Sequence, residues 1–260
     1  MATSGTLNVV SRPLRTLDAR LVNGLWQLYS DHYDNVTRDA FEADLANKQS
    51  VFVGFDSGSG AVKGFSTAAL YRHRCEGQTV GVYFSGDTVV HPDYWGQKAL
   101  HKAVLRALLA WKVRHPLTRL YWFLICSGYR TYLTMVRTFP EHWPHHERGL
   151  PPRERRMIDS LARARFGAAW RPEQGVVRIE GPQAVVKRLV APVTAQVRSL
   201  PEVQFFMRAN PGYERGDELA MIGRVNAAAY GQFGLKLAGR WARALAGRPA
   251  LRQPLGVGSR

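Results

Sequence analysis

Residues 80–100 read VGVYFSGDTVVHPDYWGQKAL, and this stretch decides the fold. Its apolar run up to Val90 predicts a buried strand, and the polar turn that follows leads into an amphipathic pattern over 99–114 that is typical of a helix. Residues 120–126 are apolar throughout, as in a strand that is covered on both faces. Strand, turn, helix and strand in this order form one crossover unit.

The residues before this stretch predict two helices and an antiparallel meander. Apolar residues first recur at helical spacing, and the period then changes to that of strands joined by turns rich in glycine and serine. The predicted elements are an edge strand within 7–17, helices over 18–33 (with Asp18 as N-cap) and from Thr37, and strands over 51–55 and 62–71.

The residues after the crossover strand predict a short helix, a basic insertion and a closing hairpin. The predicted elements are helices over 129–137 and 153–166 and strands over 175–179, 203–207 and 219–222. Residues 1–225 are therefore predicted to form one domain with an insertion at about 141–200. Residues 226–260 form a basic tail that is helical in part, either packed on the body or lying on a membrane surface.

Composition favours a folded protein with an acidic partner. Of the 260 residues, 45% are hydrophobic and 22% charged, which is enough to bury a full core. The formal net charge of +16 points to nucleic acid, an anionic membrane, a phosphorylated cofactor or an acidic carrier protein. Cys75 and Cys126 suggest neither a disulfide framework nor a zinc spacing. No signal peptide and no apolar run of roughly 18 residues is seen, so we expect a cytoplasmic protein.

The order of elements and the turn after Val90 resemble those of the GNAT superfamily of N-acyltransferases. In that family a Val-x-Pro-like step, here Val90-His91-Pro92, leads into an Arg/Gln-x-x-Gly-x-Gly/Ala turn. Backbone N–H groups of the turn and the helix N-terminus hold the coenzyme A pyrophosphate. Gly96 keeps a glycine of this pattern, whereas Lys98 and Leu100 stand where glycines are usual. The resemblance covers roughly residues 7–139 and 203–222 and implies a mixed-sheet α/β (α+β) fold.

The resemblance also implies a donor site for acyl-CoA or an acyl-phosphopantetheine thioester. Two interpretations of the altered turn stay open: the side chains of Lys98 and Leu100 block the close approach that glycine permits, or Lys98 and Gln97 contact phosphate themselves. Ser127 occupies the region of a family Asn. The implied donor-binding residues are Val89, Val90, Trp95, Gly96, Gln97, Lys98, Ala99 and Ser127.

Family chemistry needs a base that takes a proton from the acceptor amine. Asp87 is the candidate, with Tyr83 and Ser85 at alternate positions predicted to share its face of the strand, where burial would raise the pKa of the carboxyl. The other interpretation is a bulge at Ser85-Gly86-Asp87 in which Asp87 caps local backbone groups; Gly86 fits both. Tyr132 lies near the position of a family Tyr and is the candidate acid for the leaving thiolate, or else a packed core aromatic.

Two further features remain beside the resemblance. Residues 141–147 contain His142, His145 and His146, but Trp143-Pro144 interrupts any regular helix, so the segment predicts a solvated or entrance-lining loop and no metal is expected. Basic residues gather late in the chain, which suits docking of an acidic acyl carrier protein. They include Arg148, Arg153, Arg155, Arg156, Arg163, Arg165, Arg171, Lys187 and Arg188.

Two functions follow from these observations. The first is an N-acyltransferase that moves an acyl group from acyl-CoA or an acyl carrier protein to a small-molecule amine. The second is a catalytically inactive GNAT-fold protein that binds nucleic acid, anionic lipid or an acidic protein through its basic residues.

Overall fold

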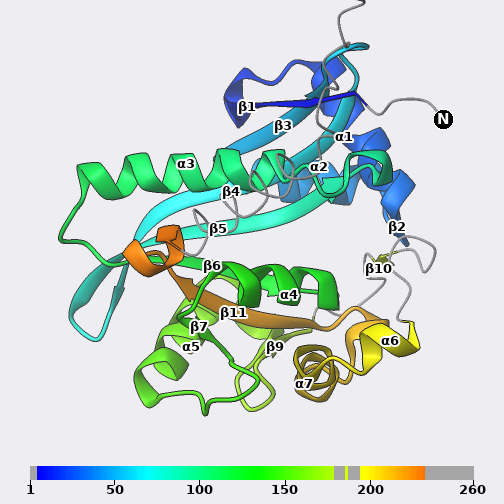
Figure 1. Cartoon of the computed structure of the whole chain (residues 1–260). Coiled ribbons are helices and arrows are strands. Elements are labelled where there is room, and N and C mark those ends of the chain that lie inside the picture. The colour runs from blue at the N-terminus through cyan, green and yellow to red at the C-terminus, as the bar shows by residue number, and fades with distance from the viewer. Residues whose placement is uncertain (1–4, 179–184, 187–193, 232–260) are drawn as a thin grey trace, which may run out of the picture.

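The computed structural model describes residues 5–178, 185–186 and 194–231, and it is built around one large twisted sheet (Figure 1). The strand order is β1-β3-β4-β5-β6-β11-β9-β8, and β7 also pairs with β11. Every adjacent pair in this sheet is antiparallel except β5 and β6, which are parallel. The strands are β1 (Leu7–Pro13), β3 (Ser50–Asp56), β4 (Val62–Cys75), β5 (Gln78–Val90), β6 (Leu120–Cys126), β7 (His142–Trp143), β8 (Trp170–Arg171), β9 (Val176–Val177) and β11 (Glu218–Arg224).

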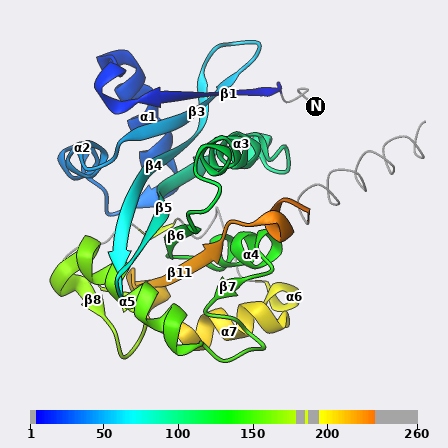
Figure 2. The same cartoon turned by 90° about the vertical axis from the view of Figure 1, so that its left-hand side faces the viewer.

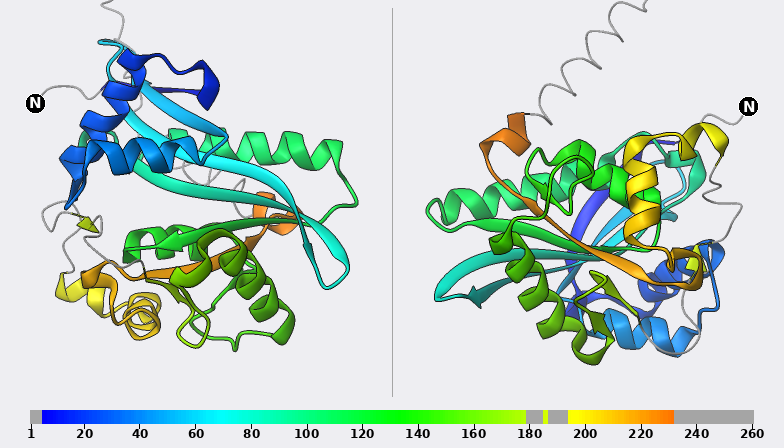
Figure 3. Two further views of the ribbon diagram at one scale, coloured as in Figure 1. Left: turned by 180° about the vertical axis from the view of Figure 1, so that it is seen from behind. Right: turned by 90° about the horizontal axis from the view of Figure 1, so that it is seen from below.

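Helices cover both faces of this sheet (Figures 2 and 3). They are α1 (Ala19–His32), α2 (Arg38–Ala46), α3 (Ala99–Arg114), α4 (Tyr129–Thr138), α5 (Pro152–Phe166), α6 (Ala195–Arg198) and α7 (Pro201–Ala209). Apolar residues of α3, α4 and α7 pack in one core cluster, while α5 packs in a second cluster and α1 and α2 in a third. Residues of β4 alternate between the clusters: Ala68 belongs to the first cluster, Ala69 to the second and Phe65 to the third. Strand alternation therefore places α3 and α4 on one face and α1, α2 and α5 on the other.

The predicted first half of the chain is confirmed. Asp18 caps α1 by accepting a 2.7 Å hydrogen bond from the Leu21 N–H, and Thr37 caps α2. The crossover unit of β5, α3 and β6 lies where it was predicted, so the predicted mixed-sheet α/β fold class is confirmed by the sheet of this chain. A small second sheet pairs β2 (Tyr33–Asp34) with β10 (Val185–Val186). No helix among the described residues is long and apolar enough to cross a membrane.

The predicted strand over 203–207 is wrong. These residues belong to α7, which begins with Pro201 at its first turn and buries Val203 and Phe206 at helical spacing. Two adjacent Phe residues satisfied a strand pattern as well as a helical one, and packing on α4 decided between them. The last long strand, β11, pairs with β6 and not with a hairpin partner at 203–207. Of the predicted tail at 226–260, residues 232–260 lie outside the described part of the chain.

Candidate active site

Strands β5 and β6 diverge near the end of β5, before the turn at 92–98. Their parallel pairing runs from Gly81 with Leu120 to Ser85 with Leu124, and β5 then continues to Val90 without pairing to β6. The two strands therefore splay beyond Ser85. A gap in the sheet opens between their carboxyl ends, where a ligand can pass between the two helical layers.

A β-bulge at the same level turns Asp87 to the opposite face of the sheet. Pairing with β4 shifts between Ser66, which opposes Thr88, and Ala68, which opposes Ser85. Gly86 and Asp87 thus oppose the single residue Thr67, which reverses the alternation of β5 beyond this point.

The predicted sharing of a face by Asp87, Tyr83 and Ser85 is therefore wrong. Tyr83 lies in the cluster with α3 and α4, and Ser85 Oγ accepts a 2.7 Å hydrogen bond from Trp122 Nε1 on that side. Asp87 instead lies toward α2, where Asp44 and Lys48 act on it. The predicted bulge at 85–87 is confirmed, and the alternation rule fails across it; the capping of backbone groups by Asp87 stays a prediction.

A cavity of about 730 Å³ occupies the gap. Its wall comes from the end of β5, the turn at 92–98, the first turns of α3 and α4, and the end of β6. It also reaches the end of α1 and the start of β2, at His32 and Tyr33, which belong to the α1–α2 side. The cavity is therefore accessible to groups from both helical layers.

The altered turn does not plug the cavity. Gly96 and Lys98 both take left-handed backbone conformations, with φ values of 85° and 56°. The side chain of Leu100 points down onto β4, where a Cβ added at Gly64 would lie 3.2 Å from Leu100 Cδ1. The backbone N–H groups in the first turn of α3 have no carbonyl partner within the helix. Lys98 adds a positive charge beside them.

Gln97 differs from its neighbours in the turn. Its Nε2 donates to Gly5 O and its Oε1 accepts from Leu7 N, each at 2.9 Å, so the side chain ties the start of β1 to the turn. It does not line the cavity, whereas the other predicted donor-binding residues do: Val89, Val90, Trp95, Gly96, Lys98, Ala99 and Ser127.

Arg130 adds a second cation at this end of the cavity. It lies in the first turn of α4, and its guanidinium stacks 4.5 Å from the Trp95 ring centroid. Trp95 Nε1 in turn donates a 2.7 Å hydrogen bond to Val90 O. The aromatic ring thus holds the guanidinium at the cavity wall near Lys98. Sequence patterns gave no signal for Arg130, because it is brought to the turn by α4.

Asp87 and Asp44 belong to an acidic group on the α2 side of β5, and neither of them lines the cavity. Burial, followed by the negative charge of Asp44, raises the pKa of Asp87 to about 7, and the ammonium of Lys48 opposes this shift. Lys48 is held against Asp44 by contacts of 2.5 and 2.6 Å and its side chain is only 3% exposed. Gly86 leaves room for it, since a Cβ there would lie 2.6 Å from Lys48 Cε.

Glu218, the first residue of β11, belongs to the same acidic group. Burial raises the pKa of its carboxyl to about 8, and the negative charges of Asp87 and Asp44 add to this. The hydroxyls of Tyr29 and Tyr33 have raised pKa values through burial first and then through Asp87. Sequence analysis missed Asp44 of α2, Lys48, which follows this helix, and Glu218 of β11, because they meet Asp87 only in the folded chain.

Tyr132 lies away from the cavity wall. It is fully buried, and its ring packs against Phe205 and Phe206 of α7, with the centroid 5.7 Å from that of Phe205. Tyr129 and Thr134 of the same helix do line the cavity, as do Tyr213 and Glu214 from the segment before β11. The acid role of Tyr132 stays a prediction.

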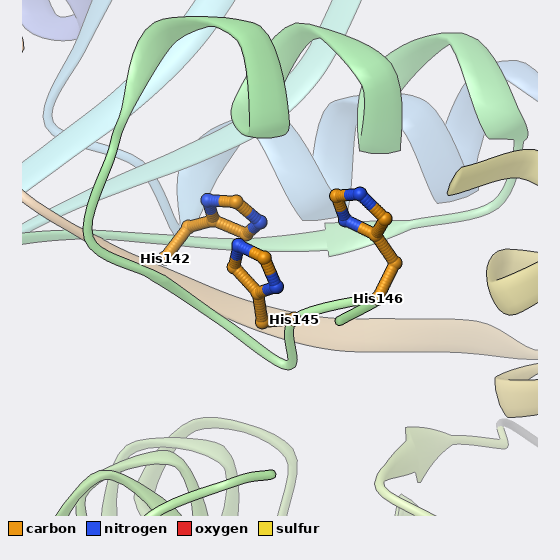
Figure 4. A group of neighbouring side chains, drawn as sticks. All are labelled: His142, His145 and His146. Atoms are coloured by element: carbon orange, nitrogen blue, oxygen red, sulfur yellow. The ribbon is translucent and has the colours of Figure 1, made fainter. Parts of the chain in front are cut away.

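The histidines at 142–146 form a compact cluster outside this cavity (Figure 4). Their rings stack, with centroids 4.4 Å apart for His142 and His145 and 4.7 Å apart for His145 and His146. Burial lowers the pKa of His142 to about 4 and also lowers that of His145. The predicted solvated loop is wrong, because His142 and His145 are buried and β7 pairs the segment to β11.

Many of the late basic residues have local partners. Arg156 pairs with Glu76, Arg163 with Asp159, and Arg165 stacks 3.7 Å from the Phe84 ring centroid. Lys187 and Arg188 lie outside the described residues. Pairing reduces the charge available to an anionic partner on this part of the surface.

No family model matches the sequence, and neither does any curated protein. Similar solved structures include a probable N-acyltransferase from Enterococcus faecalis V583, with 15% identity over 51% of this chain and 33% of that chain and a TM-score of 0.38. The match thus spans a third of that protein's length.

Two further similar structures are acetyltransferases by description. One is a GNAT family N-acetyltransferase from Escherichia coli in complex with CoA, with 15% identity over 55% of this chain and 79% of that chain and a TM-score of 0.35. The other is an acetyltransferase from Trypanosoma brucei, with 18% identity over 55% of this chain and 98% of that chain and a TM-score of 0.38. The assignment of the fold rests on the sheet topology of this chain.

Proposed function

We propose that the chain is an N-acyltransferase that moves an acyl group from a phosphopantetheine thioester to an amine. The observation that supports this proposal is the cavity in the gap between β5 and β6, whose wall includes the N-terminus of α3. The buried carboxyl of Asp87 does not line this cavity but follows Ser85 and precedes Thr88, which do. An anionic donor and a cationic acceptor have opposite charges. A gap with cations on one side and carboxylates on the other suits both.

The donor binds on the α3 and α4 side in this proposal. Its phosphates lie against the first turn of α3, where backbone N–H groups, Lys98 and Arg130 are available. The pantetheine arm follows the unpaired edge of β5 at Val89 and Val90, and the thioester reaches the gap beside Ser127. Lys98 and Arg130 supply charge where the family turn uses further glycines.

The acceptor amine enters from the α1 and α2 side. Asp87 removes a proton from the ammonium group, directly or through a water molecule, and the free amine attacks the thioester carbonyl carbon. A C–N bond forms and the C–S bond breaks; an acid donates a proton to the leaving thiolate, and the acylated nitrogen loses its second proton to the acid's conjugate base or to water, which gives the amide and the thiol. We retain Tyr132 as the candidate acid, to be tested by Tyr132→Phe.

Thiol release from acyl thioesters tests the proposal. Acetyl-CoA and longer acyl-CoAs are supplied with a panel of primary amines, and amide formation is followed by mass spectrometry. The expected result is a stoichiometric thiol and amide that both require protein and amine. Parallel assays with acyl-pantetheine and an acyl carrier protein decide which donor is used. Absence of binding to coenzyme A and to acyl carrier protein would overturn the proposal.

The alternative, an inactive protein that binds an anionic partner, is favoured by the net charge of +16. It predicts salt-dependent association with nucleic acid or anionic lipid vesicles and no thioester turnover. Turnover with any amine decides against it.

A further inference from the structure

The cluster of His142, His145 and His146 lies beneath α4 and against β11, on the loop between α4 and α5 (Figure 4). One ring nitrogen from each residue lies within 4.8 Å of those of the other two. His142 is 2% exposed and His145 8%. None of the three lines the acyl-transfer cavity, so the cluster needs an explanation of its own.

Hydrogen bonds fix which nitrogen of His142 carries the proton. Its Nδ1 lies 2.7 Å from Phe139 O, which can only accept, so Nδ1 is the donor. In the neutral ring Nε2 then presents a lone pair. This Nε2 is buried and has no hydrogen-bond partner among the described residues. A metal-binding histidine usually has this arrangement, with its second nitrogen donating to a backbone carbonyl.

His146 shows the complementary arrangement. Its Nε2 faces the carboxylate of Glu147 at 3.7 Å, and its Nδ1 is buried without a partner among the described residues. A carboxylate behind a ring favours the tautomer with the proton on that side, which leaves Nδ1 as the lone-pair nitrogen. Two buried lone pairs in one cluster are costly unless a donor or a cation satisfies both.

His145 lies between these two rings and stacks on each. Its Nδ1 accepts a 3.0 Å hydrogen bond from the Glu147 N–H. To bind the metal through this nitrogen, His145 must give up the hydrogen bond from Glu147. In a tetrahedral site with metal–nitrogen bonds of about 2.1 Å, ligand nitrogens lie roughly 3.4 Å apart. The ligand nitrogens must therefore approach one another by up to about 1.4 Å on binding, which side-chain rotation can supply.

We propose that His142 Nε2, His146 Nδ1 and His145 bind one divalent transition metal ion. Imidazole ligands select zinc, copper, nickel or cobalt over magnesium and calcium, and a compact site of three nitrogens suits Zn²⁺ with a water molecule as fourth ligand. The ion would hold the loop between α4 and α5 to β11. Its role is structural, because the cluster lies outside the cavity.

The test uses the untagged full chain, freed of metal by dialysis against a chelator and titrated with ZnCl₂ in competition with a chromophoric chelator. We expect one equivalent bound per chain, with a Kd in the micromolar range or below. At a hundredfold excess over Kd, Zn²⁺ should raise the Tm by about 5 °C. Co²⁺ should give the intense visible absorption bands of a tetrahedral site.

His146→Ala and the double variant His142→Ala/His146→Ala should each lose this binding. His115→Ala serves as the matched control, since its ring packs on Trp111 at the end of α3 and should leave binding unchanged. Circular dichroism checks folding, and His146→Ala remains informative if the double variant unfolds. The proposal is overturned if the wild-type chain binds no Zn²⁺ at 100 µM, or if folded His146→Ala retains the full affinity.

Discussion

The two sides of the proposed acyl-transfer site differ in charge and in how they are built. The donor end is one continuous piece of chain, the turn at 92–98 and the start of α3, with Arg130 added from α4. The proposed acceptor end is a buried acidic group that does not line the cavity, and it is assembled from α2, β5 and β11, which contribute Asp44, Asp87 and Glu218. A cationic end held by local sequence and an acidic end held by tertiary structure should respond differently to mutation.

The largest expected effect comes from the acceptor end. Asp87→Asn removes the proposed base and should lower kcat/KM for the amine by about 10²- to 10⁴-fold, with little change in acyl-CoA affinity. Rate assays and calorimetric titration with acyl-CoA measure the two quantities. Asp31→Asn, an exposed change on α1, is the control and should be silent.

The same variant should gain stability at high pH. Folding raises the pKa of Asp87 from 3.8 to about 7, so the native state binds more protons than the unfolded state between these values. The carboxyl therefore destabilises the fold as pH rises through this window, and the cost is complete above pH 7. Denaturant unfolding should show Asp87→Asn about 4 kcal/mol more stable than wild type at pH 8, and equal to it near pH 3. Loss of activity with a loss of stability would instead indicate a structural role.

The pH dependence of the wild-type rate gives the next effect. Because only ionised Asp87 accepts a proton, kcat/KM should fall roughly fiftyfold from pH 7 to pH 5. Measuring this pH profile with two acceptor amines of different basicity distinguishes titration of Asp87 from titration of the substrate. If the apparent pKa of the kcat/KM profile shifts with the pKa of the amine, the profile no longer supports Asp87 as the base.

The contrast between the ends also explains what could be predicted from the sequence. The donor end was predicted nearly complete, because a strand, a turn and a helix start are contiguous and each has a local pattern. The acceptor end was predicted only at Asp87. Asp44 and Lys48 lie in an ordinary helical pattern with i,i+4 spacing, which usually indicates a solvated ion pair.

Two other predictions are wrong because the outcome depended on contacts between segments that are distant in sequence. The bulge at Gly86 reversed the alternation of β5, and no propensity rule states how many residues a bulge inserts. Residues 203–207 satisfied both periods over a short apolar run, and their contact with Tyr132 of α4 selected the helix. Long patterned elements were predicted well, whereas short ones depended on contacts distant in sequence.

Gly86→Ala should disturb the acceptor end through packing. The added methyl group would lie 2.5 Å from Thr67 Oγ1 and 2.6 Å from Lys48 Cε, so the bulge or the lysine must shift. We expect a loss of about 1–3 kcal/mol in the free energy of unfolding and a lower rate, because Lys48 leaves Asp87. Gly149→Ala, which meets no atom within 4 Å, is the matched control. An unchanged Tm for Gly86→Ala would show that the bulge has more room than the structure indicates.

Lys98→Ala should produce the smallest effect, and at the donor end only. Losing one cation near the phosphates should weaken acyl-CoA binding by about tenfold, since backbone N–H groups and Arg130 remain. Lys102→Ala, one turn further along α3 and outside the cavity wall, is the control. Acyl-pantetheine lacks the nucleotide phosphates, so its KM should not change in Lys98→Ala. If both donors weaken equally, Lys98 acts through the conformation of the turn, in which it holds a φ of 56°, and the charge difference between the two ends would no longer explain donor binding.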